Sequence, residues 1–169
     1  MALPSKLKNM TLFNDGQDYL GIASEVTIPT LARTFEDYRG AGMDAPMQID
    51  MGGNVIECEW KVGGHVDQIF AQFGTVTHDG VQLRFVGAYQ DDSTGRYKSV
   101  EIAMRGRHQE IAPGTGKPGD DTEQTVKTIC SYYKLTVDGR DLIEKDEANM
   151  TFIVNGIDRL AEQRAALGY

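Results

Sequence analysis

The chain has 169 residues, the length of a single domain, and its 40% hydrophobic and 25% charged residues exclude a disordered tail or a collagen-like rod. Its net charge of -8, from 25 acidic and 17 basic residues, repels phosphates, which argues against tight binding of nucleic acid. Nineteen glycines exceed the usual share of about 7% and favour a turn-rich, largely β protein.

The cysteines and the apolar pattern limit the possibilities further. Cys58 and Cys130 lie far apart, without a CxxC pair or a neighbouring His, so we expect two buried, reduced side chains. Residues 1–8 lack the apolar core of a signal peptide. No stretch approaches the roughly 20 apolar residues of a membrane span. A soluble protein made in a cytoplasm is expected.

The first part of the chain predicts strands. Residues 10–14 and 17–21 flank Asp15-Gly16, a pair that suits a tight hairpin turn. Residues 25–38 form a long extended run in which Pro29 is tolerable only at an edge or bulge. Residues 55–60 alternate, with Ile56, Cys58 and Trp60 on an apolar face and Glu57 and Glu59 on a wet one.

The middle of the chain changes period and then returns to strands. Residues 64–73 predict a short amphipathic helix that ends at Gly74, with an apolar face of Val66, Ile69, Phe70 and Phe73. A hairpin follows around the turn at 91–95, and one face of it carries Val81, Leu83, Phe85, Val100, Ile102 and Met104.

The last third predicts a loop, two strands and a helix. Residues 113–121 are rich in Gly, Pro and Asp and read as a loop. Residues 125–137 form a long strand with Ile129, Tyr133, Leu135 and Val137 on one side, and Asp138-Gly139 turns it into residues 140–144. Residues 155–168 predict a helix with Asn155 as N-cap, Asp158 in the first turn and Gly168 after the end.

No catalytic, cofactor or metal site emerges from the residue pattern. The segment Gly114–Lys117 resembles a phosphate loop but lacks the first glycine and the final Ser or Thr. His65, His78 and His108 are scattered, which favours solvated or capping roles. Serine and cysteine have no neighbouring histidine, and the acidic residues lack the spacing of a calcium loop. We therefore expect no enzyme activity and no cofactor.

Residues 38–53 combine four glycines with three methionines, and the sequence predicts a mobile loop that becomes ordered against a partner. The alternative is a long loop folded over the chain's own core. The residues assigned to an inter-subunit loop over 39–53 are Arg39, Gly40, Gly42, Met43, Asp44, Pro46, Met47, Met51, Gly52 and Gly53.

An ordered set of segments resembles the major tail tube protein of contractile-tailed bacteriophages and the similar tube subunit of R-type pyocins. These segments are Leu12–Gly16, Glu25–Pro29, Glu36–Gly40, Gly42–Pro46, Ser131–Leu135, Val137–Arg140 and Asn155–Asp158. The resemblance implies a single tail-tube domain over residues 1–169, mainly β, an antiparallel sandwich or barrel with a short central helix and a C-terminal helix.

The same resemblance implies hexameric rings that stack into a hollow tube inside a sheath, with a baseplate initiator and a terminator as partners. The tube would be part of the virion tail, assembled in the host cytoplasm, through which DNA passes without specific binding and with no stable membrane insertion. A bore that conveys a polyanion should not bind it, so Glu36, Glu57, Glu59 and Glu101 are expected to line it. Arg84 and Arg105, on the polar face of Glu101, weaken that assignment.

Three alternatives stay open. The first is the tube of a headless bacteriocin or a type VI secretion-like tube. The second is a monomeric β-sandwich binding module, which would need an exposed aromatic cluster, whereas Trp60 and most aromatics lie on apolar faces of the predicted elements. An enzyme comes third.

Overall fold

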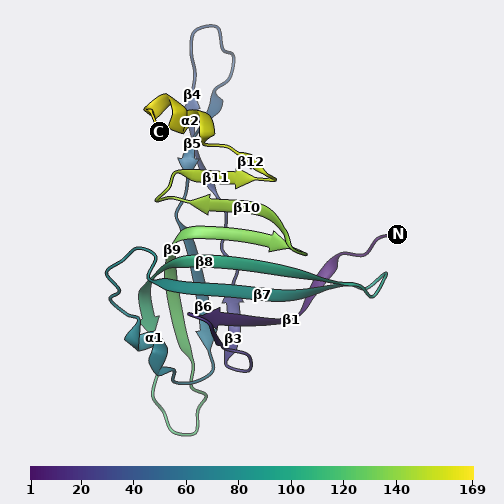
Figure 1. The fold of residues 1–169 in the computed structure, drawn as a ribbon, viewed down its shortest axis with the longest axis vertical. Coiled ribbons are helices and arrows are strands. Elements are labelled where there is room, and N and C mark those ends of the chain that lie inside the picture. The colour runs from purple at the N-terminus through teal and green to yellow at the C-terminus, as the bar shows by residue number, and fades with distance from the viewer.

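The computed structural model describes residues 1–169 as a mainly antiparallel β protein with two short helices, as the sequence predicted. The strands are β1 (Ser5–Asn14), β2 (Gln17–Asp18), β3 (Ala23–Thr27), β4 (Arg33–Tyr38), β5 (Met47–Gly53), β6 (Ile56–Val62), β7 (Val81–Asp91), β8 (Tyr97–Ala112), β9 (Gln124–Val137), β10 (Arg140–Asp146), β11 (Thr151–Val154) and β12 (Ile157–Asp158). The helices are α1 (Asp67–Ala71) and α2 (Ala161–Leu167) (Figure 1). Neither helix is long and apolar enough to cross a membrane.

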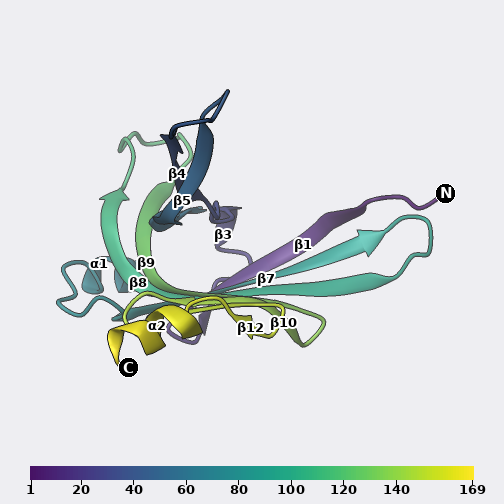
Figure 2. The ribbon, with the colours of Figure 1, turned by 90° about the horizontal axis from the view of Figure 1, so that it is seen from above.

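Ten strands form one sheet, in the order β12-β11-β10-β9-β8-β7-β1-β2, with β6 paired to the first half of β9 and β3 paired to β6. Figure 2 shows β8 and β9 bending sharply, so that the sheet has two halves, here called wings, that share these strands. Residues 19–23 connect the wings, because the Tyr19 amide donates to Leu12 O (2.8 Å) and the Gly63 amide to Ile22 O (2.9 Å). The curled part of the sheet is thus nearly closed around a core.

The core confirms most of the strand faces predicted from alternation. Trp60 and Cys58 are fully buried, while Glu57 beside them is exposed. The buried apolar residues are Leu12, Tyr19, Ile56, Cys58, Trp60, Val62, Ile69, Val81, Leu83, Phe85, Ile102, Met104, Val126, Cys130 and Tyr133. Burial raises the pKa of both thiols, that of Cys130 to about 12. The extended run at 25–38 is interrupted between β3 and β4, at the segment that holds Pro29.

A β-bulge makes one predicted strand face wrong. Gly106 of β8 pairs with Cys130 of β9, and Arg105 pairs with Tyr132, which leaves Ser131 without a partner on β8. The extra residue reverses the alternation. Val126, Thr128 and Cys130 before it therefore face the core together with Tyr133 and Leu135 after it. Ile129, expected on that face, lies on the other side.

The first helix is shorter than predicted and buries less. Of its expected apolar face, Ile69 is fully buried and Val66 packs against the core, but Phe70 and Phe73 are 39% and 58% exposed. The five residues of α1 amount to little more than one turn, too short to bring positions four and seven residues apart onto one covered stripe. Gly74, with a φ of 81°, ends the segment as expected.

The C-terminal helix begins later than predicted. Asn155 and Gly156, with φ of 50° and 80°, form the turn between β11 and β12 rather than an N-cap. Asp158 lies in β12, where its carboxylate accepts from the Leu160 amide (3.0 Å) and binds Arg164 of α2. The Asn-Gly pair follows its strong preference for a hairpin turn. Gly168 follows the helix with a φ of 88°, as predicted.

His108 is buried, not solvated as expected from the sequence. Its Nδ1 lies 2.9 Å from Thr128 Oγ1, which also accepts from Trp60 Nε1 (3.1 Å). The Gln72 amide oxygen can only accept, so His108 Nε2 carries the proton and donates to Gln72 Oε1 at 3.1 Å. In this neutral ring Nδ1 accepts from the Thr128 hydroxyl, and the ring ties β8 to the end of α1.

This arrangement predicts that the free energy of unfolding decreases as the pH is lowered. Burial lowers the pKa of His108 from 6.5 to about 4, with Asp15 opposing weakly. Between these values the unfolded chain binds the proton and the folded chain does not, so the full stability exists above pH 6.5 and declines toward pH 4. We expect urea unfolding at fixed protein concentration to give a free energy about 2 kcal/mol lower at pH 5 than at pH 7.

The His108→Gln variant is the control, because it has no imidazole to protonate at this position. Its free energy of unfolding should change much less between pH 7 and pH 5, since His65 and His78 are exposed. An equal acid dependence in both proteins would contradict the assignment to His108.

Candidate functional site

The unusual features of the structure are three exposed surfaces. The described residues include no group of three or more His, Cys, Asp or Glu side chains that could hold a metal ion. The segment Gly114–Lys117 lies in the loop between β8 and β9, as expected. His65 contacts Asp67 (2.9 Å) and His78 contacts Ser131 (2.9 Å), both at the surface.

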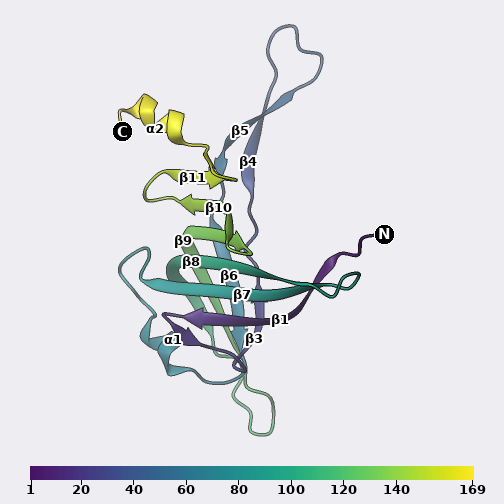
Figure 3. The same cartoon turned by 45° about the vertical axis from the view of Figure 1, so that its right-hand side comes forward.

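The first surface is the hairpin of β4 and β5, which projects from the body at the top of Figure 3. Its pairing places Tyr38 opposite Met47 and Glu36 opposite Ile49, so these four residues share one face, and a bulge at Met51 interrupts the alternation beyond it. The apolar side chains Tyr38, Met47 and Ile49 are 41–57% exposed. The other face carries Asp37, Gln48 and Asp50 together with the exposed ring of Phe35. The face of Tyr38, Met47 and Ile49 is the more apolar of the two, and it has no cover within the chain.

The base of the hairpin is fixed to the body. Arg33 pairs with Asp50 and lies 5.4 Å from the ring centre of Phe152 on β11, and the Thr34 hydroxyl bonds Asn54. The Arg33 guanidinium, helped by the Gly52 amide, lowers the pKa of Asp50. Beyond this base the two strands contact only each other. A two-stranded hairpin alone is marginally stable in water, so a partner surface would stabilise this one.

The predicted loop over 39–53 is therefore partly wrong in structure. Met47, Met51, Gly52 and Gly53 belong to β5, and only residues 39–46 form the tip. The tip holds the other predicted loop residues, Arg39, Gly40, Gly42, Met43, Asp44 and Pro46. Within it, Arg39 Nε donates to Met43 O (3.2 Å). The alternation of apolar and polar residues over 47–51 is typical of a strand, but the high Gly and Met content of the segment favoured the prediction of a loop.

The second surface is the outer half of β1, β7 and β8, which extends away from the rest of the chain (Figure 2). Here Leu7 lies opposite Tyr89, and both side chains gather over Gly87, where a Cβ would be 2.8 Å from the Tyr89 ring. Leu7 is 42% exposed and Tyr89 is half-buried. This side continues the core-facing side of the sheet but lies beyond the core, so apolar groups remain uncovered.

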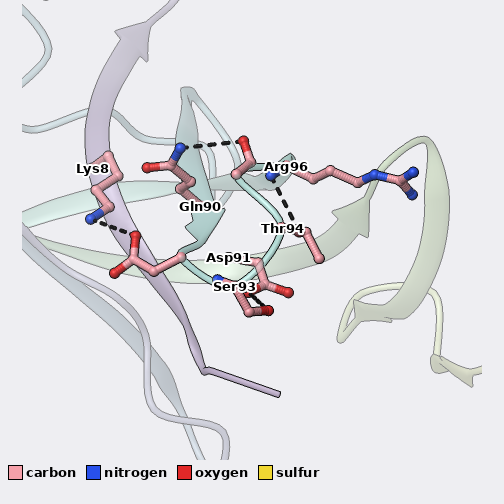
Figure 4. Close-up of polar contacts among 8 residues, drawn as sticks. Lys8, Gln90, Asp91, Ser93, Thr94 and Arg96 are labelled. Carbon is pink, nitrogen blue, oxygen red and sulfur yellow. Dashed lines mark hydrogen bonds and ion pairs between the residues drawn. The ribbon is translucent and has the colours of Figure 1, made fainter. Parts of the chain in front are cut away.

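The end of this extension is well defined. Asp91 accepts from the Ser93 amide (2.8 Å) and the Ser93 hydroxyl (Figure 4). These two bonds lower the pKa of Asp91. Lys8 of β1 reaches across to Asp92 (3.2 Å), and Gln90 donates to Gly95 O (3.3 Å). The turn is thus held in place by its own side chains, and the extension ends in a defined shape.

The third surface, called the polar hollow for its charged residues, has a volume of about 590 Å³, lies on the side of the sheet away from the core and is lined by both charged and apolar side chains. Its lining residues are Phe13, Gly16, Gln82, Leu83, Arg84, Glu101, Ala103, Met104, Arg105, Tyr132, Lys134 and Thr136. Three of them are basic, and each is engaged by a neighbour. Arg84 Nε lies 2.9 Å from Glu101 Oε1, and Lys134 Nζ lies 3.2 Å from Asp141 Oδ2.

The third cation of the hollow, Arg105, stacks 3.9 Å from the ring centre of Tyr132, whose hydroxyl donates to Glu144 (3.1 Å). The Thr136 hydroxyl and then the Lys134 ammonium lower the pKa of Asp141, and the carboxylate in turn raises the pKa of Lys134. Both groups stay charged at neutral pH. Two of the three cations of the hollow thus have carboxylate partners, while Arg105 lies over a neutral ring.

The four acidic residues expected in a channel do not lie together. Glu101 lines the hollow, where it pairs with Arg84. Glu57 and Glu59 lie on β6, and Glu59 is the cross-strand neighbour of Lys127. Glu36 lies on the β4–β5 hairpin. The alternation of β6 correctly placed its two glutamates outside the core, but sequence alone could not relate three separate elements in space.

Comparison with known proteins identifies relatives along nearly the whole chain. Residues 4–168 match the family described as phage tail tube protein FII. The chain is 44% identical over 171 residues to the tail tube protein of Escherichia phage P2, covering 99% of both chains. It is 39% identical over 158 residues to the major tail tube protein of Serratia phage KSP20, covering 92% of this chain and 91% of the relative.

Solved structures share the fold at much lower identity. The sheath–tube complex of the extracellular contractile injection system PVC in its extended state has a TM-score of 0.60 at 7% identity, covering 79% of this chain and 91% of that one. The tube-terminating cap of the anti-feeding prophage has a TM-score of 0.61 at 5% identity, covering 80% and 93%. These similarities show the fold alone.

Proposed function

Since this chain belongs to the family of phage tail tube proteins, we propose that it is the structural subunit of the inner tube of a contractile phage tail. The observation that carries the proposal is the match to two phage tail tube proteins over more than nine tenths of the chain. As a structural subunit of the virion tail it needs no active site, and we assign it no enzymatic activity.

We infer that copies of the chain form hexameric rings and that the rings stack into a hollow tube. A contact that closes on itself gives a ring, and a second contact that does not close gives a filament. The apolar face of the β4–β5 hairpin and the outer side of β1 and β7 are two separate surfaces that a second copy would cover. Pairing strand edges between copies would also remove exposed edges.

The hairpin is the element to which we assign contacts between neighbouring subunits or successive rings. The proposed contact residues are Arg39, Gly40, Gly42, Met43, Asp44, Pro46, Met47, Met51, Gly52 and Gly53, and we add Tyr38 and Ile49 because they share a face with Met47. Methionine adapts its shape to a partner surface, which suits a contact that must be made repeatedly along a tube.

The remaining partners are those of a contractile tail: a sheath around the tube, a baseplate component that starts it and a terminator that ends it. DNA would pass through the bore without specific binding. Glu36, Glu57 and Glu59 remain predicted acidic residues of the bore. Glu101, the fourth glutamate predicted there, is the only one that lines the polar hollow. The sequence relatives come from phages, which favours a phage tail over the tube of a headless bacteriocin.

Negative-stain electron microscopy of the purified chain over a range of concentrations tests the proposal. Rings or hollow filaments with sixfold end views are the expected result. A chain that stays a single-copy globule at every concentration, with its hairpin and outer strands shielded by its own segments, would contradict the assembly. End views with another rotational symmetry would contradict the hexamer alone.

A further inference from the structure

Two of the three basic residues of the polar hollow have a carboxylate of the same chain as partner, and the third, Arg105, lies over a neutral ring. Arg84, Arg105 and Lys134 are its basic residues, and each already contacts an acidic or aromatic side chain of the same chain. We propose that this hollow faces the DNA in the bore and that the two ion pairs keep Arg84 and Lys134 from binding phosphates. The inference rests on the proposed function.

Position supports the hollow as the bore surface. It lies on the side of β7, β8 and β9 away from the core, while the opposite side of the same sheet carries Leu7 and Tyr89 beyond the core. Water-exposed apolar groups favour contact with another copy, and charged groups favour water. A sheet with these two sides therefore turns its paired charges toward the wet interior of a tube.

The pairs are poorly suited to a purely stabilising role. The side chains of Arg84 and Glu101 are 49% and 38% exposed, and those of Lys134 and Asp141 are 32% and 51% exposed. Ion pairs this exposed contribute little to folding stability. Their effect on a passing polyanion is larger, because DNA carries one charge per roughly 1.7 Å of its axis and binds free cations through counterion release.

Ion pairing prevents the binding of DNA phosphates in a different way from a negatively charged surface. A free arginine repeated around a ring and along a tube would make a ladder of phosphate sites. An arginine whose charge is cancelled 2.9 Å away presents a dipole, and its residual field is weak beyond a Debye length of about 8 Å in physiological salt. Neutral pairing also avoids the mutual repulsion that many unpaired carboxylates would create between closely packed subunits.

Variants that lack one member of an ion pair, and then both members, distinguish the effect of pairing on DNA binding from the effect of net charge. The first set is Glu101→Gln, Arg84→Gln and the double variant, and the double variant keeps the net charge of the original chain. Asp121→Asn is the matched control, because it removes one exposed carboxylate that has no ion pair or hydrogen bond and so frees no cation. The full-length proteins are titrated into fluorescently labelled double-stranded DNA at several salt concentrations.

Glu101→Gln is expected to bind DNA severalfold more tightly than Asp121→Asn, with a log–log salt slope steeper by about 0.9 for each additional phosphate neutralised. The double variant should return to the weak binding of the original chain. Equal affinities for Glu101→Gln and Asp121→Asn would overturn the inference, because net charge alone would then govern binding. A double variant that binds as tightly as Glu101→Gln would overturn it as well.

A second pair keeps the test decisive if Glu101→Gln does not fold, as judged by circular dichroism. Asp141→Asn should bind DNA more tightly and Asp141→Asn with Lys134→Gln should not. Microscopy of the same preparations separates the two proposals. Tubes without any difference in DNA binding would refute the pairing role alone, whereas a chain that never assembles would refute the tube.

Discussion

A chain in which Glu36–Ile49 are replaced by an Asn-Gly turn is expected to fold normally and to form no tubes. The replaced residues are the outer hairpin, which contacts nothing else in the chain, and Phe35 and Asp50 stand opposite each other where the new turn would join them. The base contacts of Arg33 with Asp50 and Phe152 are retained. The free energy of unfolding should change by less than about 1 kcal/mol, since the lost residues are mostly exposed and none belongs to the core.

Electron microscopy and urea unfolding of the same preparation measure the two effects. Single substitutions sharpen the result, because neighbouring residues of β5 point to opposite faces. Ile49→Thr removes an apolar side chain from the uncovered face and should weaken tube formation, while Gln48→Thr changes the opposite face and should not. Tubes of normal length from the shortened chain would show that the hairpin plays no part in assembly.

The second large effect is expected from Gly106→Ala, which should destabilise the monomer by about 3 kcal/mol or more. A Cβ at this position would overlap the carbonyl oxygen of Ile129 and lie 2.8 Å from Cys130 Cα. Both contacts are backbone atoms at the bulge, so no side chain can move aside. Because a domain is typically stable by only about 5–15 kcal/mol, a loss of this size removes a substantial part of its free energy of unfolding.

Gly116→Ala is the matched control, because a Cβ there would meet nothing within 4 Å and no positive φ is required. Urea unfolding of the two variants at one protein concentration gives the comparison. We expect the control to match the original chain within about 0.5 kcal/mol. Similar losses in both variants would mean that the close approach at the bulge is not what requires glycine.

The sequence predicted those parts of the fold in which alternation runs undisturbed. Val81, Leu83 and Phe85 face the core as expected, because β7 has no register shift against β8. The face of Ile129 was not predictable, since the bulge at Ser131 depends on a partner strand that the local pattern does not reveal. At Asn155 two local preferences compete, and the pairing of β11 with β12 decides in favour of the turn.

The candidate surfaces were less accessible to prediction, because each depends on segments that are distant in sequence. Alternation places Arg84 and Glu101 on a polar face, yet their pairing follows from the register of β7 against β8. Lys134 and Asp141 meet across the turn at Asp138-Gly139. The segment at 39–53 stands out by composition, and only its pairing with β4 reveals an uncovered apolar face.

The burial of Cys58 and Cys130 has a consequence for a particle that must persist outside the cell that made it. Oxidants and thiol reagents react with thiolate, which is scarce when the pKa of a thiol lies near 12, as at Cys130, and Cys58 is sealed from solvent altogether. Storage in air should therefore leave both sulfurs reduced. Reaction of either thiol with a labelling reagent therefore shows that the protein has opened, and the rate of labelling measures how often it unfolds.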